Sequence, residues 1–484
     1  MEIMVFYDDT GRKSEVISDI IGNKGFSDVV VKKKKLEEYY QESVKKIYPN
    51  VKWRKIRSLS EYADILKDLE LRREEQVKIL HCFSNYIISN EEKVLLSVQK
   101  LLFIDEPYRS MEHKKVAMAM FPDVETYALF CKNVTSGQKP WDTARKIKES
   151  FETEGLVDIS IIGNFIQCIT GNFDSRYFNY LKGNEYTLIK SSSNKKKIKS
   201  EYNFYHLLPE DMKFWFVMPF RYVEESNSAS YTMERLHMAD LAIKWVHGSM
   251  DEYEFEELMD KYFFFFHSRH SKSCEKEKYE SMARTLYTDK VKMRIEKLKT
   301  LSEFEKIEKA LYLSEGDNIE SLKEKYFLLK EKIESGNSYP LKSVIGHGDP
   351  CFANALYNRS TKTLKFIDPK GALNEDELWT NPYYDIAKLS HSVCGNYDFF
   401  NNALFDIKLN DRFSYELEIP FDNSRFVKIF KKKLEENGFD YYTVRIYEVS
   451  LFLSMLPLHM DNPFKVFGFV LNVKNILEEI EKNV

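Results

Sequence analysis

The secondary-structure pattern changes near residue 155, and this change limits the folds available to the chain. Before it, β-rich runs alternate with charged helical stretches; the runs are MVFY, DVVV, VKILHCFSNYIIS, KLLFI and VAMAMF. Such alternation is typical of an α/β layer domain with a largely buried sheet, which we predict for residues 1–155. A chain of 484 residues also exceeds the size that one core usually supports, so further domains are expected.

A turn-rich segment, SGQKPWD, marks the boundary, and the helical pattern WDTARKIKESFETEG ends there on a glycine. From about Asp158 the β-rich runs lie close together: ISIIGNFIQCITG, SRYFNYL and EYTLIKSS, then FWFVMPFRYVE and ASYTMERL. One helix, NKKKIKSEYNFYHLL, separates the third run from the fourth. This order predicts a small antiparallel sheet over residues 156–236. The charged helical pattern that follows predicts a mostly helical lobe over residues 237–484.

Composition excludes several classes of protein. The chain is 43% hydrophobic and 31% charged, with a net charge of −4, which excludes global disorder and a general attraction to polyanions. The basic run Lys195–Lys199 lacks interleaved aromatic residues, so we expect no nucleic-acid partner. No apolar stretch approaches the length of a membrane span, and no CxxC pair occurs among the six cysteines. We therefore expect a reduced, cytoplasmic protein without a membrane span.

One segment carries the pattern of a phosphoryl-transfer site. VIGHGDPCFANALYN contains His347, Asp349 and Asn354 with the spacing H-x-D-x-x-x-x-N, and the following apolar strand, LKFID, ends in Asp368. Phosphoryl transfer needs a carboxylate beside the attacking hydroxyl, and an amide oxygen and a second carboxylate for Mg²⁺. A hairpin through ALYNRSTKTLKFI brings Asp368 back to the loop that holds Asp349 and Asn354.

The segments GHGDPCFANALY and FIDPKG resemble those of the aminoglycoside phosphotransferase and choline kinase group. These small-molecule kinases share the bilobal protein-kinase-like fold, and the resemblance extends from about Asp158 to the C-terminus. It implies an α+β domain with a small antiparallel N-lobe sheet and a mostly helical C-lobe. No arginine lies between His347 and Asp349, and no A-P-E segment follows Asp368, which disfavours a protein kinase.

The resemblance implies a role for each residue of the motif. Asp349 is similar to the catalytic aspartate that orients the acceptor hydroxyl and accepts its proton, and His347 would brace the loop. Asn354 and Asp368 would hold Mg²⁺ against the phosphates of ATP. Asp385 in YYDIAKL resembles a buried aspartate that ties the catalytic loop to the next helix, or it caps that helix.

Such a kinase also needs a lysine on a strand and a glutamate on the next helix. Lys190 ends the apolar strand EYTLIKSS, and Glu201 lies on the helix that follows. Other candidates lie nearby: Lys182 and Lys195–Lys199 for the lysine, and Glu185 and Glu210 for the glutamate.

The strand ASYTMERL resembles the hinge strand, whose backbone would bond the adenine of ATP around Met233, Glu234 and Leu236. These side chains are equally compatible with a core position. The phosphate-covering turn falls near Thr170–Arg176 and has one glycine, as in glycine-poor small-molecule kinases.

The segment GALNEDELWTNPYYD is the candidate acceptor site. Its acidic and aromatic residues suit a cationic amino alcohol or aminosugar by charge and cation–π attraction; they are Glu375, Asp376, Glu377, Trp379, Tyr383 and Tyr384. The alternative, an exposed acidic loop with a packed aromatic anchor, is favoured.

The sequence predicts an ATP- and Mg²⁺-dependent kinase that phosphorylates a hydroxyl of a sugar, aminosugar or amino alcohol, in cell-surface polysaccharide synthesis. The alternative is a nucleotide-binding pseudokinase or scaffold without phosphoryl transfer. The N-terminal α/β domain suggests a degenerate nucleotidyltransferase-like sheet with a binding or docking role, because MVFYDDTGRKSE lacks a glycine-rich phosphate loop. The acceptor and the oligomeric state stay open.

Overall fold

The computed structural model describes residues 2–31, 33–72, 75–169, 180–184, 186–337 and 339–484. The chain forms two compact units, Met1–Asp174 and Ser175–Val484. The division lies beyond the expected one at residue 155, because two later elements belong to unit 1. Strand β10 (Leu156–Asp158) pairs with β6 (Tyr86–Ile88), and α7 (Ile162–Ile169) contacts β10.

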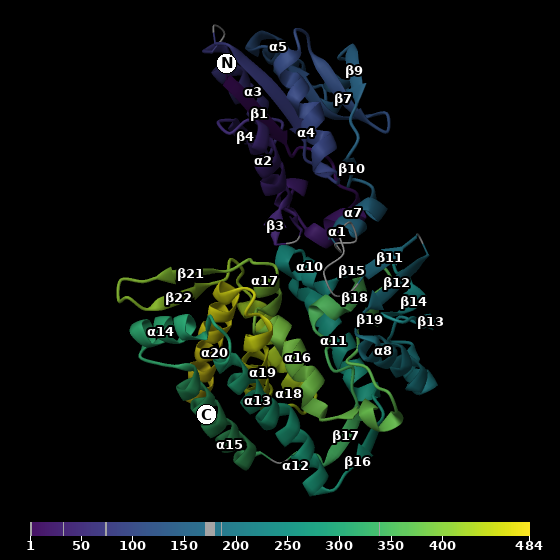
Figure 1. Ribbon diagram of the computed structural model, residues 1–484, viewed down its shortest axis with the longest axis vertical. Coiled ribbons are helices and arrows are strands. Elements are labelled where there is room, and N and C mark those ends of the chain that lie inside the picture. The colour runs from purple at the N-terminus through teal and green to yellow at the C-terminus, as the bar shows by residue number, and fades with distance from the viewer. Residues whose placement is uncertain (1, 32, 73–74, 170–179, 185, 338) are drawn as a thin grey trace. The chain divides into compact units, whose positions relative to one another are not determined.

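Unit 1 is built on a six-stranded mixed sheet in the order β4-β1-β5-β8-β7-β9 (Figure 1). Its strands are β1 (Glu2–Asp8), β4 (Lys52–Ile56), β5 (Val77–Phe83), β7 (Tyr108–Glu112), β8 (Lys115–Phe121) and β9 (Glu149–Glu152). Strands β4, β1 and β5 are mutually parallel, whereas β8 runs antiparallel to both β5 and β7. A mixed sheet with helices between its strands agrees in general with the predicted α/β class.

Helices cover both faces of this sheet, as the alternating side chains of β1 show. Phe6 stacks on Tyr127 with ring centroids 4.7 Å apart, while Tyr7 meets Tyr40 at 5.2 Å from the other face. Besides α7, the helices of unit 1 are α1 (Glu15–Ile21), α2 (Leu36–Ile47), α3 (Glu61–Glu70), α4 (Glu91–Gln99), α5 (Val124–Thr135) and α6 (Pro140–Arg145).

Four local predictions in the first 169 residues need correction. KLLFI forms the 3-10 helix Lys100–Phe103 rather than a strand. DVVV contributes only β2 (Val30–Val31), which pairs with β3 (Lys34–Lys35) outside the main sheet. The helix predicted from Trp141 ends at Arg145, and β9 follows because it pairs with the edge of β7. ISIIGNFIQC forms α7 rather than a strand.

The error at α7 has a physical reason. A short apolar run has no decisive periodicity, so tertiary packing selects its conformation. Phe165 of α7 is buried and meets Phe26 edge-on, with centroids 6.3 Å apart.

Unit 2 begins with a four-stranded antiparallel sheet in the order β11-β12-β14-β13. Its strands are β11 (Tyr180–Gly183), β12 (Thr187–Ser192), β13 (Pro219–Glu224) and β14 (Ala229–Glu234). Helix α8 (Lys195–Leu207) follows β12 and packs on the sheet, and the short α9 (Glu210–Lys213) follows it. The strands expected at EYTLIKSS and ASYTMERL and the helix that follows EYTLIKSS are confirmed, whereas FWFVMPFRYVE forms a strand only from Pro219 onward.

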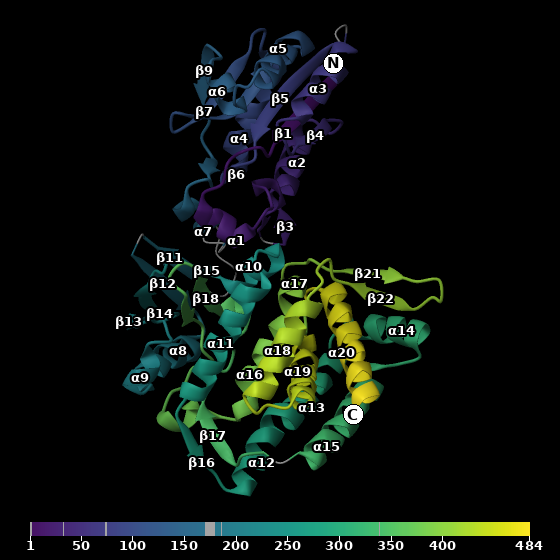
Figure 2. The same ribbon diagram turned by 180° about the vertical axis from the view of Figure 1, so that it is seen from behind.

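The rest of unit 2 is mostly helical, and α16, α19 and α20 lie side by side (Figure 2). Its helices are α10 (Leu241–His247), α11 (Glu252–Ser268), α12 (Lys276–Arg284), α13 (Lys290–Lys299), α14 (Phe304–Glu315), α15 (Ile319–Gly336), α16 (Pro382–Val393), α17 (Tyr397–Asn401), α18 (Ser424–Glu436), α19 (Tyr441–Met455) and α20 (Pro463–Asn483). Short strands connect them: β15 (Ala239–Asp240), β16 (Ser271–Ser273), β17 (Lys342–Ile345), β18 (Ala355–Asn358), β19 (Thr363–Phe366), β20 (Trp379–Thr380), β21 (Asp406–Leu409) and β22 (Tyr415–Glu418).

One apolar core extends through unit 2, from Phe204 in α8 to Ile480 in α20. This core therefore connects α8, the helix beside the sheet, to the helical part of unit 2. Its packing holds the loops of the site in position. A sheet followed by many helices agrees with the predicted class; its division into two kinase lobes stays a prediction. None of the helices described is both long and apolar enough to span a bilayer.

Candidate active site in unit 2

A buried lysine joins the sheet, α8 and the segment after β19. The Nζ atom of Lys190, on β12, lies 2.8 Å from Oε2 of Glu201 on α8 and 2.7 Å from Oδ1 of Asp368. Lys190 and Glu201 are buried, whereas the side chain of Asp368 is 42% exposed. Three residues singled out from separate parts of the sequence therefore meet at one point.

The two carboxylates favour the charged form of Lys190. Burial lowers the pKa of Lys190, but the carboxylates of Asp368 and Glu201 outweigh burial and raise it overall. Tyr231, opposite Lys190 in the β12–β14 pair, donates its hydroxyl to Oε2 of Glu201 at 3.2 Å. Of the competing glutamates, Glu210 pairs instead with Lys213 within α9.

The loop between β17 and β18 carries His347 and Asp349, and hydrogen bonds determine the tautomer of the histidine. Nε2 of His347 donates to the carbonyl of Ile367 at 2.9 Å, and Nδ1 accepts from the amide of Asp349 at 3.0 Å. Burial lowers the pKa of His347, which keeps the ring neutral. Gly348 between them has φ +84°, and a Cβ there would lie 2.5 Å from the Cβ of Lys370. His347 therefore braces the loop and does not itself reach toward a ligand.

Asp385, on α16, accepts hydrogen bonds from the backbone of this loop. Its Oδ2 accepts from the amide of His347 at 2.9 Å, and its Oδ1 accepts from the amide of Gly348 at 2.8 Å. Arg269 donates to Oδ2 at 3.0 Å, and both side chains are buried. The N-cap of α16 is Asn381, so the loop-tying interpretation of Asp385 holds and the capping interpretation does not.

Asn354 and Asp368 are neighbours because the β18–β19 hairpin closes on itself. The amide of Ile367 donates to the carbonyl of Asn354 at 3.0 Å, and Nδ2 of Asn354 donates to the carbonyl of Asp349 at 3.0 Å. The amide nitrogen of Asn354 is thus engaged inward, and its Oδ1 is the atom left to bind a ligand. Asp368 has φ +55°, a conformation rare for residues other than glycine and often found at functional sites.

The side chains of Asn354 and Asp368 match the kind and number of protein ligands that Mg²⁺ takes in a nucleotide-binding site. The described residues hold no group of three or more His, Cys, Asp or Glu side chains placed to bind a metal ion. Mg²⁺ in such sites takes one or two protein oxygens and completes its shell with phosphates and water. Oδ1 of Asn354 and the carboxylate of Asp368 supply that number.

A second lysine, Lys388, was not recognised from the sequence. Its Nζ lies 3.1 Å from Oδ1 of Asp349, although the two residues belong to different elements. Burial raises the pKa of Asp349, but the ammonium of Lys388 outweighs burial and lowers it overall. Lys388 follows Asp385 by one helical turn in YYDIAKL, and that spacing was the available signal, because residues three apart share a helix face.

The residues predicted to contact adenine are only partly brought together. Met233 lines a small pocket with Glu201, Tyr231 and Asp368. Glu234 and Leu236, which the structure also describes, do not line this pocket. Glu234 pairs with Thr187 at the end of the β12–β14 ladder. The predicted phosphate-covering turn, Thr170–Arg176, lies outside the described residues.

The candidate acceptor segment is an exposed acidic turn with a packed anchor. Glu375, Asp376 and Glu377 are exposed, whereas Tyr383 and Tyr384 are buried. The ring of Trp379 is already covered by the ammonium of Lys272, 3.8 Å from its centroid. The aromatic groups therefore do not form an open cage for a cation, in agreement with the favoured interpretation.

A further buried carboxylate, Asp398 on α17, makes the stability of the protein depend on pH. Burial raises the pKa of Asp398 to about 7, and Asp240 and Asp349 act in the same direction. Between about pH 4 and pH 7 the folded state therefore keeps a proton that the unfolded chain has lost, so stability falls as the pH rises.

Asp398→Asn is expected to flatten this dependence. The loss of unfolding free energy between about pH 5 and pH 8 should be about 2 kcal/mol smaller in the variant than in the parent protein. Urea denaturation at both pH values measures it, with the exposed Asp411→Asn as the matched control. Parallel pH profiles for parent and Asp398→Asn would contradict the assignment.

Comparison with solved structures finds a weak similarity to aminoglycoside phosphotransferases. One is a thermostable mutant of aminoglycoside phosphotransferase APH(4)-Ia in its apo form, with a TM-score of 0.34, 10% identity, and coverage of 63% of this chain and 94% of that chain. A variant in ternary complex with ADP and hygromycin B has a TM-score of 0.34 and 10% identity, covering 66% of this chain and 98% of that chain.

APH(4)-Ia itself gives a TM-score of 0.34 at 11% identity, covering 66% of this chain and 97% of that chain. No protein-family model matches the chain. No curated protein matches it at a significant level. Because the structural similarities are weak, the side-chain geometry alone carries the functional assignment.

Proposed function

We propose that unit 2 transfers the γ-phosphoryl group of ATP to a hydroxyl of a small molecule such as a sugar, aminosugar or amino alcohol. The observation that supports this most is the position of Lys190, whose ammonium bridges Glu201 and Asp368 at 2.8 and 2.7 Å. A lysine held by a helix glutamate beside a metal-binding aspartate is what a kinase needs to hold nucleotide phosphates.

Each residue has a role in this proposal. Lys190 binds the phosphates, and Asn354 and Asp368 hold Mg²⁺, which neutralises charge on the phosphates when bound. Asp349 accepts a hydrogen bond from the acceptor hydroxyl. The bond from the γ-phosphorus to the β–γ bridging oxygen breaks, a bond to the acceptor oxygen forms, and the hydroxyl proton passes to the Asp349 carboxylate.

Lys388 changes the basicity of Asp349, the carboxylate that accepts the proton in this step. By lowering the pKa of Asp349 it makes the carboxylate a weak base, suited to orienting the hydroxyl until late in the transfer. This agrees with a loose transition state, in which positioning and charge stabilisation supply most of the rate. Cytoplasmic location and a role in cell-surface polysaccharide synthesis stay predictions.

The proposal is tested by incubating the full chain with ATP, Mg²⁺ and a panel of sugars, aminosugars and amino alcohols, and by following phosphate transfer to each. Transfer to at least one acceptor is expected. Mg²⁺-dependent ATP binding without transfer to any acceptor would favour the nucleotide-binding pseudokinase.

Asp368→Ala is expected to abolish Mg²⁺-dependent nucleotide binding. ATP with Mg²⁺ at about 100 times its Kd should raise the melting temperature of the parent protein by about 5 °C, because the ligand binds only the folded state. The variant loses one of two metal ligands, so adding Mg²⁺ should leave its melting temperature with ATP unchanged. Asp411→Ala, on an exposed loop, should behave as the parent protein. The same Mg²⁺-dependent shift in Asp368→Ala would contradict the metal assignment.

A further inference from the structure

Unit 1 contains a cavity of about 250 Å³ at one edge of its sheet. Gly11 and Arg12 follow the carboxyl end of β1, and Phe83 ends the adjacent parallel strand β5. Strand β8 runs the other way, so its first residue, Lys115, lies at the same edge. All four residues line the cavity.

This edge is a topological switch point. From β1 the chain passes to β4 on one side of it, and then crosses to β5 on the other side. Connections that leave in opposite directions open a crevice outside the carboxyl ends of the strands, where open α/β sheets bind ligands.

The wall of the cavity is positively charged. Arg12 and Arg145 are exposed and line the cavity, and neither guanidinium has a hydrogen-bond or ion-pair partner among the residues the structure describes. Lys115 also lines it and pairs with Asp158, Nζ to Oδ2, at 2.7 Å. The other oxygen of Asp158 accepts from Nδ2 of Asn85 at 3.0 Å. The carboxylate in the wall is thus already satisfied, and the two arginines are left for an anion.

An aromatic surface accompanies the charge. Trp141 lines the cavity and lies on α6 four residues before Arg145, so both side chains share one face of that helix. Trp141 is partly exposed, with the ammonium of Lys139 5.7 Å from its ring centroid, and the exposed part of its ring can contact a flat or cyclic ligand. Guanidinium groups are the side chains best suited to phosphate oxygens.

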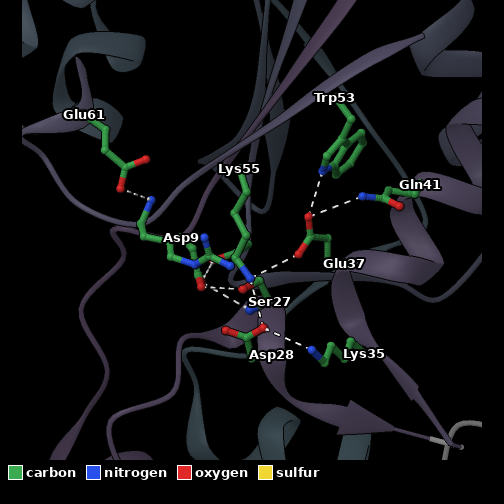
Figure 3. Close-up of polar contacts among 11 residues, drawn as sticks. Asp9, Ser27, Asp28, Lys35, Glu37, Gln41, Trp53, Lys55 and Glu61 are labelled. Atoms are coloured by element: carbon green, nitrogen blue, oxygen red, sulfur yellow. Dashed lines mark hydrogen bonds and ion pairs between the residues drawn. The ribbon is translucent and has the colours of Figure 1, made fainter. Parts of the chain in front are cut away.

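A second polar cluster in unit 1 serves as a contrast (Figure 3). There Nζ of Lys55 lies 3.0 Å from Oδ1 of Asp28 and 3.1 Å from Oε2 of Glu37, and Trp53 donates to Oε1 of Glu37 at 2.9 Å. These groups pair with one another and tie α2 to β4. At the cavity, by contrast, Lys115 is paired with Asp158, but the guanidinium groups of Arg12 and Arg145 have no such partner among the described residues.

We propose that this cavity binds a cyclic compound carrying a phosphoryl group, either a sugar phosphate or a nucleotide. The phosphoryl group lies between Arg12 and Arg145, and the ring lies against Trp141. The proposal is independent of the kinase activity of unit 2, because every residue it uses belongs to unit 1.

Isothermal titration of the full chain with glucose 1-phosphate and with uridine monophosphate tests the proposal, and glucose and uridine serve as the probes without phosphate. At least one phosphorylated probe should bind. The corresponding compound without phosphate should have a Kd at least about tenfold higher. Which probe binds distinguishes a sugar phosphate from a nucleotide.

The double variant Arg12→Gln/Arg145→Gln should weaken binding of that probe by about tenfold or more. The matched control Lys67→Gln/Lys132→Gln removes the same charge from exposed positions outside the cavity wall, and should bind as the parent does. Asp368→Ala should also bind as the parent, which separates this site from the nucleotide site of unit 2. Absence of binding by both phosphorylated probes, or equal affinities in the two double variants, would overturn the proposal.

Discussion

Asp349→Ala is expected to slow phosphoryl transfer to the acceptor by about 10³-fold or more, while the Kd for Mg²⁺-ATP changes by no more than about threefold. The carboxylate of Asp349 stands apart from the triad of Lys190, Glu201 and Asp368; the ion pair that it forms is with Lys388. Its removal therefore deletes the group that orients the hydroxyl and leaves the groups that bind phosphate in place. Single-turnover rates and titration with ATP measure the two quantities separately.

Two controls make this result specific. Asp411→Ala removes an exposed carboxylate from the loop between β21 and β22 and should leave the transfer rate unchanged. Lys388→Met should raise the pKa of Asp349 and move the acid limb of the pH–rate profile upward, an effect that simple loss of folding would not produce. Undiminished transfer by Asp349→Ala would exclude it as the catalytic aspartate.

Asp385→Ala is expected to lower the free energy of unfolding by about 3–5 kcal/mol, the usual cost of breaking a buried ion pair by removing one partner. The variant leaves the guanidinium of Arg269 buried without its carboxylate, and it leaves the amides of His347 and Gly348 without an acceptor. Burial already lowers the pKa of Arg269, which shows how strongly its environment disfavours an unpaired charge. Urea denaturation measures the change.

A double-mutant cycle separates the ion pair from the rest of this effect. Arg269→Met/Asp385→Ala should be less destabilised than the sum of the two single variants by about 1–3 kcal/mol. Hydrogen exchange at His347 and Gly348 should accelerate in Asp385→Ala and much less in Arg269→Met, because only the first removes their acceptor. Strictly additive losses would show that the two side chains do not stabilise each other.

Much of the candidate site was predictable because its parts are close in sequence. Asp349 and Asn354 share one loop, and Asp368 follows the next hairpin, so local geometry alone brings them near each other. Lys190 was recognisable as a charged residue that ends an apolar strand, and the structure indeed buries it. In such cases the periodicity and spacing of residues in the sequence predict which side chains lie at the same edge of the sheet.

Other features were unpredictable because a distant element decides them. Nothing beside Arg269 in the sequence indicates that it faces Asp385, and the spacing of Lys388 from Asp385 does not by itself indicate that Lys388 contacts Asp349. Likewise, Glu149–Glu152 reads as part of a helix until the unpaired edge of β7 is available to it. Tertiary contact overrides local propensity in short segments, because the free-energy differences between helix and strand there are small.

The residue pattern alone predicted alternating strands and helices in unit 1, the sheet-then-helix order of unit 2 and the candidate residues of the proposed phosphoryl-transfer site. Periodicity and turn chemistry are properties of neighbouring residues, so they can be recognised without any knowledge of the fold. The pairing of Lys190 with Glu201 and Asp368, the support of the loop by Asp385 and the arginine-lined cavity at the edge of the unit 1 sheet depend on the tertiary structure. The partner of a charged group is whichever side chain the packed backbone brings within a few ångströms, and only the fold determines that.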